Sequence, residues 1–156
     1  MLRAADQLDV RFLRDMLRHA YHWRLGDPDL PVYRYVQNWG RPGDAGVIVS
    51  DGPNAYGAAW YRLFPSSAPG FGFVDEATPE VTIAVVPSQR GRGTGGELLE
   101  ALLERARDDG FPRLSLSAEP GQTHFYEKHG FHELRREDGT VTMVADLSQL
   151  AKPAPG

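Results

Sequence analysis

The chain has 156 residues, of which 41% are apolar and 24% are charged, an ordinary composition for a globular domain with its own core. The formal net charge of −4 and the pI near 5.7 leave no basic field that could wrap nucleic acid. The chain has no cysteine, which excludes disulfides, thiolate metal sites and a thiol nucleophile.

We predict one domain over residues 1–150 and a frayed tail over residues 151–156. The N-terminal sequence MLRAADQLDVRF has a charge every few residues and no continuous apolar run, so it predicts neither a signal peptide nor a membrane span. We therefore expect a cytoplasmic protein that has neither nucleic acid nor a membrane as a partner. A homo-oligomer stays open, because association depends on surfaces that the sequence does not reveal.

The first half of the chain predicts a helix and a hairpin. A helix over residues 7–20, with Asp6 as its N-cap, is indicated by apolar residues at helical spacing, namely Leu8, Phe12, Leu13, Met16 and Leu17. Residues 21–44 mix aromatic residues with helix breakers and predict broken helix and loop. The runs AGVIVSD and AYGAAWYRLF flank Gly52-Pro53-Asn54 and predict an antiparallel hairpin. Residues 65–79 form a long Pro/Gly-rich connection that is either functional or poorly ordered.

The second half alternates strands with helices. A strand is predicted over residues 80–86 and an amphipathic helix over residues 97–108. The short run LSLSA predicts a further strand, which a helix of about two turns follows, between Pro120 and Gly130. The dipeptide Asp138-Gly139, between two strand-like runs, predicts a final hairpin.

Glycines at positions 91, 93, 95 and 96 lie between the predicted strand and helix, within VVPSQRGRGTGGELL. They satisfy the Gly-x-Gly-x-x-Gly spacing of dinucleotide sites, but in that motif the glycines turn directly off the strand. Here residues 87–90 intervene, Arg90 and Arg92 lie in the loop, and the chain offers one parallel unit where a dinucleotide fold needs several. The residues indicate instead an anion site, in which helix N–H groups bind phosphate oxygens. A merely flexible loop is the alternative.

The same stretch resembles the acetyl-CoA-binding signature of the GNAT superfamily of N-acetyltransferases. Arg90, Gly93 and Gly95 occupy the fixed positions of its pattern Arg/Gln-x-x-Gly-x-Gly/Ala. Downstream, FYEKHGF resembles the Tyr-x-x-x-Gly-Phe segment of the family, with Tyr126 as its tyrosine. The resemblance implies the GNAT fold of the α+β class, a three-layer arrangement with a mixed, largely antiparallel sheet and helices on both faces.

One residue departs from the family pattern. The family often has an asparagine seven residues before the tyrosine, and this chain has Glu119 there. In the family this asparagine contacts the pantetheine arm, so the resemblance does not imply the usual contact at Glu119. The alternative role for Glu119 is a capping or solvated carboxylate ahead of Pro120.

The resemblance implies transfer of the acetyl group from acetyl-CoA, as co-substrate, to a primary amine by direct attack in a ternary complex. We expect a small-molecule acceptor. The alternatives are a peptide or protein amine, or a non-catalytic acyl-CoA-binding module. No histidine spacing suits a metal, so we expect none.

Two side chains are candidates for proton transfer. Strand alternation puts Glu80 on one face with Thr82, Ala84 and Val86, and the resemblance implies that Glu80 deprotonates the amine, directly or through water. The alternative is a solvated glutamate at a strand end. Tyr126 is the candidate acid for the thiolate, with a packed core tyrosine as the alternative. Because Tyr126 directly follows another aromatic residue on a short helix, we expect only one of the two to face the cofactor.

The remaining expected contacts follow from the same motifs. The expected oxyanion donor is a backbone N–H near Val85 or Val86, if the strand splays there as in the family. The expected acetyl-CoA contacts are Ala84, Val85, Val86, Arg90, Gly91, Arg92, Gly93, Thr94, Gly95 and Gly96. The expected acceptor contacts are Trp23, Tyr33, Tyr35 and Trp60. For these four aromatic residues core filling is the alternative.

Overall fold

The structure is a computed structural model that describes residues 1–21, 32–137 and 139–147. Its sheet has seven strands in the order β1-β2-β3-β4-β5-β7-β6. The strands are β1 (Leu2–Ala4), β2 (Ala45–Asp51), β3 (Asn54–Arg62), β4 (Glu80–Val85), β5 (Arg113–Ala118), β6 (Phe131–Glu137) and β7 (Thr140–Asp146). All neighbouring strands are antiparallel except β4 and β5, which are parallel. The predicted mixed, largely antiparallel sheet is therefore confirmed.

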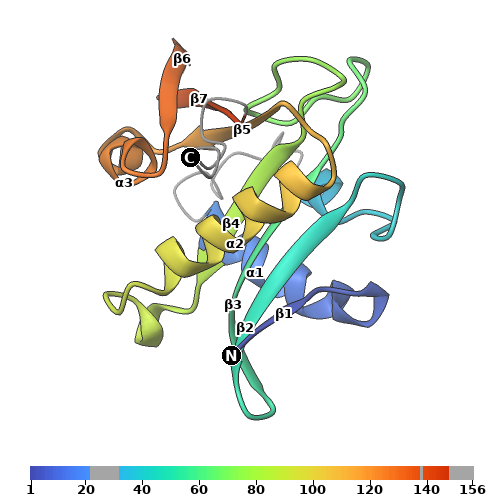
Figure 1. The fold of residues 1–156 in the computed structure, drawn as a ribbon, viewed down its shortest axis with the longest axis vertical. Coiled ribbons are helices and arrows are strands. Elements are labelled where there is room, and N and C mark those ends of the chain that lie inside the picture. Colours follow the sequence, from blue (N-terminus) through green and yellow to red (C-terminus); the bar gives the residue numbers. More distant parts are fainter. Residues whose placement is uncertain (22–31, 138, 148–156) are drawn as a thin grey trace, which may run out of the picture.

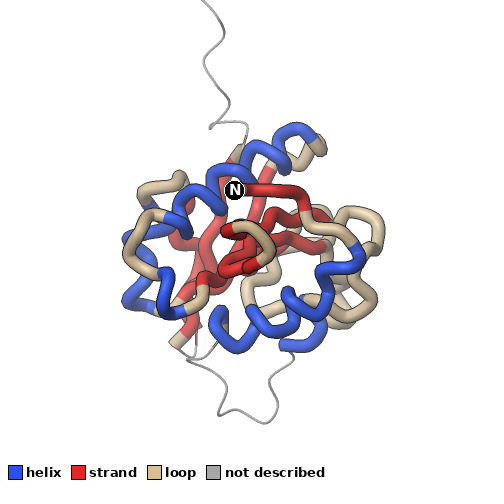
Figure 2. The backbone as a smooth tube through the Cα atoms, turned by 90° about the horizontal axis from the view of Figure 1, so that it is seen from below, coloured by secondary structure: helices blue, strands red, loops and turns tan. Residues whose placement is uncertain are grey.

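Helices cover both faces of the sheet, so the three-layer prediction is also confirmed (Figures 1 and 2). The α-helices are α1 (Val10–Ala20), α2 (Thr94–Asp108) and α3 (Thr123–Glu127). The described 3-10 helices are η1 (Gln7–Asp9), η3 (Val32–Tyr35), η4 (Pro87–Gln89) and η5 (Pro120–Gln122). One core cluster lies between the sheet and α2, and a second lies between the sheet and α1. Side chains of β4 alternate between these two clusters, as a pleated strand requires.

Most predicted elements are present at the predicted places. The two hairpins form, and Asp6 caps the first helical turn through its side chain, which accepts from the N–H of Leu8. Leu8 itself is 91% exposed and not in the core, because residues 7–9 form a 3-10 turn ahead of α1. Helix α2 begins at Thr94, three residues before its predicted start, since the glycines at 95 and 96 are helical. The short strand β1 was not predicted.

The connection over residues 65–79 is an ordered part of the fold. Phe71 and Phe73 pack on the α1-side cluster. Gly72 lies directly on β5, where a Cβ atom would be 2.5 Å from the backbone carbon of Leu116. This segment therefore closes the α1-side face of the sheet beside the start of β4. Residues 22–31 and the predicted tail lie outside the described residues.

The sheet divides between β4 and β5. These two parallel strands share a single register pair, Glu80 with Ser115, although each strand has six residues. On its other side β4 pairs with β3 along its whole length. The strands therefore diverge beyond Glu80, and the far end of β4 keeps one edge without a neighbouring strand.

A buried ion pair anchors η3 to the sheet. The Arg62 guanidinium binds both carboxylate oxygens of Asp44 at 3.0 and 2.7 Å, and the side chains are 1% and 3% exposed. Arg62 also donates to the backbone carbonyls of Arg34 and Gln37, which lie on either side of Tyr35. The pair therefore fixes the backbone that carries Tyr35.

Replacing Asp44 by Ala should destabilise the protein by about 3–5 kcal/mol, because it leaves the Arg62 charge buried without its partner. Urea unfolding measures the loss. The matched control is Glu133→Ala, which breaks the exposed pair with Arg136 and should leave the urea midpoint unchanged. Equal midpoints for both variants would show that the buried pair does not support the fold.

Candidate active site

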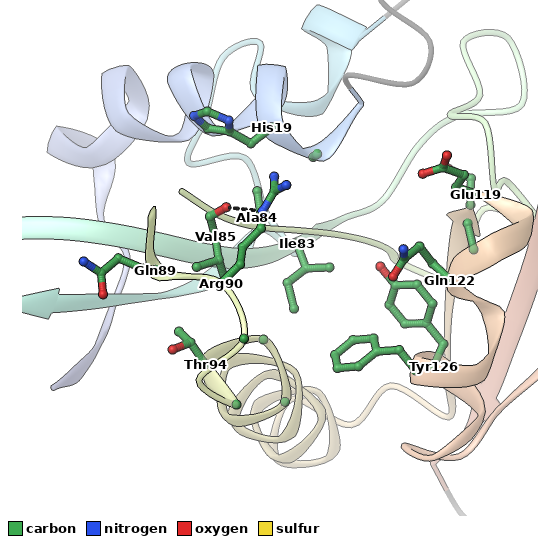
Figure 3. A pocket seen from close by; sticks show the side chains of 18 residues that line it. His19, Ile83, Ala84, Val85, Gln89, Arg90, Thr94, Glu119, Gln122 and Tyr126 are labelled. Carbon is green, nitrogen blue, oxygen red and sulfur yellow. Dashed lines mark hydrogen bonds between the residues drawn. The ribbon is translucent and has the colours of Figure 1, made fainter. Parts of the chain in front are cut away.

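A cavity of about 580 Å³ opens where β4 and β5 diverge. Its wall combines the end of β4, the loop and first turn of α2, the end of β5, and α3 (Figure 3). The end of α1 contributes His19 and Ala20. Three stretches that are distant in sequence, residues 19–20, 83–96 and 117–126, therefore meet at one opening in the sheet. A cavity of this volume is in the range of small-molecule and cofactor sites.

The exposed edge of β4 offers backbone hydrogen-bonding groups to the cavity. The N–H of Val86 donates to the carbonyl of Tyr56 on the β3 side at 2.9 Å. Since backbone groups alternate along an antiparallel ladder, the N–H groups of Ile83 and Val85 point to the opposite side, toward the gap. Of the two expected oxyanion donors, Val86 is therefore occupied and Val85 is available.

The cavity lining on β4 comes from both faces of the strand. Ala84 lines the cavity together with Ile83 and Val85, whose side chains lie on the opposite face of the strand. Glu80 and Thr82 do not line it. The physical reason is the divergence of the strands, because the ligand space lies at the edge of β4, where side chains of both faces are accessible.

The start of α2 forms one wall of the cavity. Its N-cap is Gly93, in a left-handed conformation with φ 78°, and no side chain caps the helix. The first N–H groups of a helix have no partner within it, and a positive φ costs glycine little. Thr94, Gly95 and Gly96 therefore present unpaired N–H groups beside the cavity that they line. Such a helix start attracts phosphate groups.

The two arginines of the loop lie differently. Arg90 lines the cavity, and its Nε donates to the carbonyl of Val85 at 3.1 Å, drawn as a dashed line in Figure 3. This hydrogen bond joins the loop to the end of β4. Arg92 is exposed and lies outside the lining, as does Val86, which packs against the α1-side cluster. The other eight expected acetyl-CoA contacts line the cavity.

The opposite wall comes from α3. Phe125 and Tyr126 both line the cavity, so the expectation that only one of them would face it was wrong. Their rings meet edge to face at 5.0 Å, and at this short helix both reach the opening from the same end. Burial raises the pKa of Tyr126 to about 12, so the phenol stays protonated at neutral pH and remains a donor. Its hydroxyl forms no hydrogen bond to a described residue.

Glu80 is buried beside the cavity, with 1% of its surface exposed. The Tyr35 hydroxyl donates to Oε2 of Glu80 and accepts from the N–H of Phe71 at 2.7 Å. Oε1 has no hydrogen bond of standard geometry, although the backbone N–H of Gly72 is near enough to lower the pKa. A strand-end glutamate in solvent, the alternative from the sequence, does not describe this environment.

Burial raises the pKa of Glu80 from its ordinary value of 4.5 to about 7. The hydrogen bonds from Tyr35 and Gly72 and the charge of Arg135 on β6 lower the pKa, but by less than burial raises it. A carboxyl group that titrates near neutral pH is suited to accept and return protons under ordinary conditions.

The expected acceptor residues have different environments. Tyr35 is fully buried and binds Glu80, and Trp60 is fully buried with its Nε1 donating to the Tyr35 carbonyl at 3.0 Å. Trp23 lies outside the described residues, and the side chain of Tyr33 is also outside them. Tyr35 and Trp60 thus belong to the support of Glu80, and neither lines the cavity.

Several lining residues had no sequence signal. His19, Gln89, Ser117, Ala118 and Gln122 line the cavity, and nothing in their local sequence marks them. Glu119, noted for its departure from the family pattern, also lines it and makes no cap hydrogen bond at the start of η5. Within residues 1–21, 32–137 and 139–147, no group of three or more His, Asp or Glu side chains is placed to hold a metal ion. No helix in the described part of the chain is both long and apolar enough to cross a bilayer.

Comparisons with known proteins agree with the motifs. The model of the acetyltransferase (GNAT) family matches residues 10–131. The uncharacterized N-acetyltransferase YjcF of Bacillus subtilis (strain 168) is 30% identical over 104 residues, which are 67% of this chain and 67% of YjcF. The matched residues include β4, the glycine-containing loop and the start of α2.

Solved structures share the fold. Ribosomal-protein-alanine N-acetyltransferase from Brucella melitensis matches with a TM-score of 0.69 at 22% identity, over 94% of this chain and 99% of that one. The protein yncA from Salmonella typhimurium, solved with its cofactor acetyl-CoA, matches with a TM-score of 0.70 at 19% identity, over 100% and 98% of the two chains. At these sequence identities the similarity shows a shared fold only.

The buried position of Glu80 predicts a specific dependence of stability on pH. Because its folded pKa lies above its ordinary value, Glu80 favours folding fully below pH 4.5, and this contribution is lost as the pH rises to about 7. Replacing Glu80 by Gln removes the titrating group. From pH 5 to pH 8, the wild type should lose about 2–3 kcal/mol more unfolding free energy than Glu80→Gln.

Urea unfolding at the two pH values measures this difference. The matched control is Glu104→Gln, at an exposed position of α2, which should keep the pH dependence of the wild type. The same pH dependence in the wild type and Glu80→Gln would mean that Glu80 is ionised in the folded protein without cost.

Proposed function

The chain belongs to the acetyltransferase (GNAT) family and is an acetyl-CoA-dependent N-acetyltransferase, and from this premise we propose that its acceptor is the primary amine of a small molecule. The observation that carries the proposal is the cavity at the β4–β5 divergence, which combines an anion-binding helix start, a free strand edge and a phenol donor.

We propose that acetyl-CoA occupies this cavity. Its diphosphate binds the N–H groups at the start of α2, with Arg90 adding charge at the rim. Its pantetheine arm carries amide groups, which match the N–H groups of Ile83 and Val85 and the carbonyl of Ile83 as an added strand would. The Val85 carbonyl already accepts from Arg90. The thioester then lies between the edge of β4 and Tyr126. Glu119, on the same wall, stands where the family often has asparagine.

In the proposed reaction the amine attacks the thioester directly within a ternary complex. The nitrogen must first be neutral, so its proton passes to Glu80. The N–H of Val85 stabilises the negative oxygen that forms on the thioester carbon. The carbon–sulfur bond then breaks, and the Tyr126 hydroxyl gives its proton to the departing thiolate. The second proton, which the attacking nitrogen loses as the amide forms, restores the Tyr126 hydroxyl.

A small acceptor fits the surroundings of Glu80 better than a peptide does. On the α1-side face, Phe71 packs against the rings of Tyr21 and Tyr35, and Gly72 lies on the β5 backbone. An extended peptide needs an open strand edge or groove. The described segment over residues 70–73 occupies that face beside Glu80, which favours an acceptor that reaches the thioester through the cavity.

The proposal is tested by measuring CoA thiol release from acetyl-CoA with a panel of acceptors. The panel contains polyamines, amino acids and aminoglycosides on one side and N-terminal peptides on the other. At least one small amine should show a kcat/KM ten times that of any peptide. Activity confined to peptides would replace the small-molecule acceptor by a protein acceptor, and no thiol release with any amine would contradict the function.

Replacing Gly93 by Ala should weaken acetyl-CoA binding at least tenfold. Gly93 has φ 78° at the helix start, so a Cβ atom both strains the backbone and disturbs the proposed diphosphate site. The matched control is Gly110→Ala, at φ 84° after the other end of α2, with equally open surroundings. Calorimetric titration should show control affinity within twofold of the wild type. Equal weakening in both variants would assign the effect to strain alone.

Replacing Tyr126 by Phe should lower kcat by 10²–10⁴, the usual range for loss of a general acid, with little change in KM for acetyl-CoA. The matched control is Tyr56→Phe, a partly buried tyrosine that packs against the same core cluster outside the cavity lining. Steady-state kinetics compares the two. A loss below about threefold for Tyr126→Phe would remove the acid role.

A further inference from the structure

The position of Glu80 raises the question of how a proton reaches it. Glu80 is 1% exposed and does not line the cavity, and the strands place it at the closed end of the β4–β5 gap. The residues of β4 that do line the cavity begin at Ile83. Because proton transfer needs hydrogen-bond distances, an amine in the cavity cannot pass its proton directly to a carboxyl group so placed.

Ser117 connects this buried region with the cavity. It lines the cavity from β5, and its Oγ is buried without a hydrogen bond of standard geometry. Since Glu80 and Ser115 are paired in register, Ser117, two residues beyond Ser115, faces the same side of the sheet as Glu80. A buried hydroxyl without a partner is costly in free energy unless a mobile water or a ligand group binds it. The Ser117 hydroxyl is therefore available to a group in the cavity.

Two tyrosines lie between Ser117 and Glu80. The Tyr21 hydroxyl is 3.3 Å from Oγ1 of Thr82, the next residue of β4 on the Glu80 face. The Tyr21 ring lies 5.1 Å from the Tyr35 ring, centroid to centroid, and the Tyr35 hydroxyl donates to Glu80. The hydroxyls of Ser117 and Tyr35 also lower the pKa of Tyr21, which burial raises, although no hydrogen bond of standard geometry joins either of them to Tyr21. Both phenols thus remain protonated and able to donate.

We propose that Ser117, Tyr21 and Tyr35, with bound water between hydroxyls that lack a direct hydrogen bond, form a hydroxyl chain that carries the amine proton from the cavity to Glu80. This inference rests on the proposed function, and it gives a role to the hydroxyls of three side chains, Ser117, Tyr21 and Tyr35. Ser117 touches the acceptor and is the catalytic end of the chain, whereas Tyr21 and Tyr35 act through it.

The proton transfer balances at each oxygen, and a bound water takes up one hydrogen and passes on another wherever two hydroxyls lack a direct hydrogen bond. The acceptor ammonium gives a proton to Oγ of Ser117, which passes its own hydrogen to the Tyr21 oxygen. Tyr21 passes its hydrogen to the Tyr35 oxygen, and Tyr35 passes its hydrogen to Oε2 of Glu80, along the hydrogen bond that already exists. The amine becomes neutral, Glu80 becomes a carboxylic acid, and each hydroxyl ends with one hydrogen. After the products leave, Glu80 returns the proton by the reverse path to water in the open cavity.

The groups around Glu80 agree with this direction of transfer. Tyr35 comes from η3, Tyr21 lies after α1, and the charge of Arg135 comes from β6, so the sole described charge that shifts the pKa of Glu80 is cationic. Burial opposes the ionised form of Glu80, whereas the hydrogen bonds from Tyr35 and Gly72 and the charge of Arg135 favour it. The balance of these effects gives a pKa of about 7. Glu80, which takes the proton at the end of the hydroxyl chain, is therefore ionised at slightly alkaline pH and can take up one proton in each turnover.

The test is the pH profile of kcat in variants that remove one hydroxyl each, Ser117→Ala and Tyr21→Phe. With the best acceptor of the panel, each variant should lower kcat 10–100-fold at pH 7.5 with KM for acetyl-CoA within twofold of the wild type. The wild-type rise of kcat around pH 7 should disappear in both variants, because Glu80 no longer exchanges protons with the cavity. Ser117→Thr keeps a hydroxyl and should retain kcat within threefold.

The matched control is Ser115→Ala, which removes another buried hydroxyl without a partner from the same face of β5, outside the cavity lining. It should keep both kcat and the pH profile. Wild-type kcat and profile in Ser117→Ala and Tyr21→Phe would overturn the chain while leaving the acetyltransferase function intact. An equal loss in Ser115→Ala would also overturn it, since packing would then explain the effect. Absence of acetyl transfer in the wild type would overturn the proposed function and the chain together.

Discussion

The divergence of β4 and β5 is the constraint on which the rest of the structure depends. A strand edge inside a sheet normally has a neighbour, because unpaired backbone groups cost free energy when they are removed from water. Here pairing stops after Glu80 and Ser115, and the groups of Ile83 and Val85 face a cavity. A ligand with amide groups satisfies them at little cost. The helix start of α2 and the rings of α3 lie around the same gap, so one local break in pairing assembles the whole site.

Desolvation of Glu80 is the second constraint on the site. The cavity side of the gap is open, while its closed end holds a carboxyl group under aromatic rings and the segment over residues 70–73. Removing water from Glu80 raises its pKa toward neutrality and also separates it from the acceptor. The protein therefore needs a path for protons, which the buried hydroxyls of the α1-side face supply in our proposal. The ion pair of Asp44 and Arg62 supports this arrangement by fixing the backbone around Tyr35.

Local sequence motifs predicted much of this site, but the features that depend on contacts between distant residues were not predicted from the residues themselves. The loop glycines, Arg90 and Tyr126 were predicted because their spacing along the chain carries the information. The strand divergence was expected only through the family resemblance and not from the residues themselves, since pairing between β4 and β5 depends on residues more than thirty positions apart. For the same reason the sequence did not indicate that Ser117 lines the cavity. The sequence also did not indicate that Phe125 and Tyr126 would both line it. Strand β1 was missed because three residues are too few for a pattern.

The most direct test of the central claim is amide hydrogen exchange with and without acetyl-CoA. If acetyl-CoA binds as an added strand in the β4–β5 gap with its diphosphate at the start of α2, the amides of residues 83, 85 and 94–96 should gain protection. The amide of Val86, which already donates to β3, should change least within this strand end. Protection confined to other parts of the chain, or none at the β4 edge, would contradict the account.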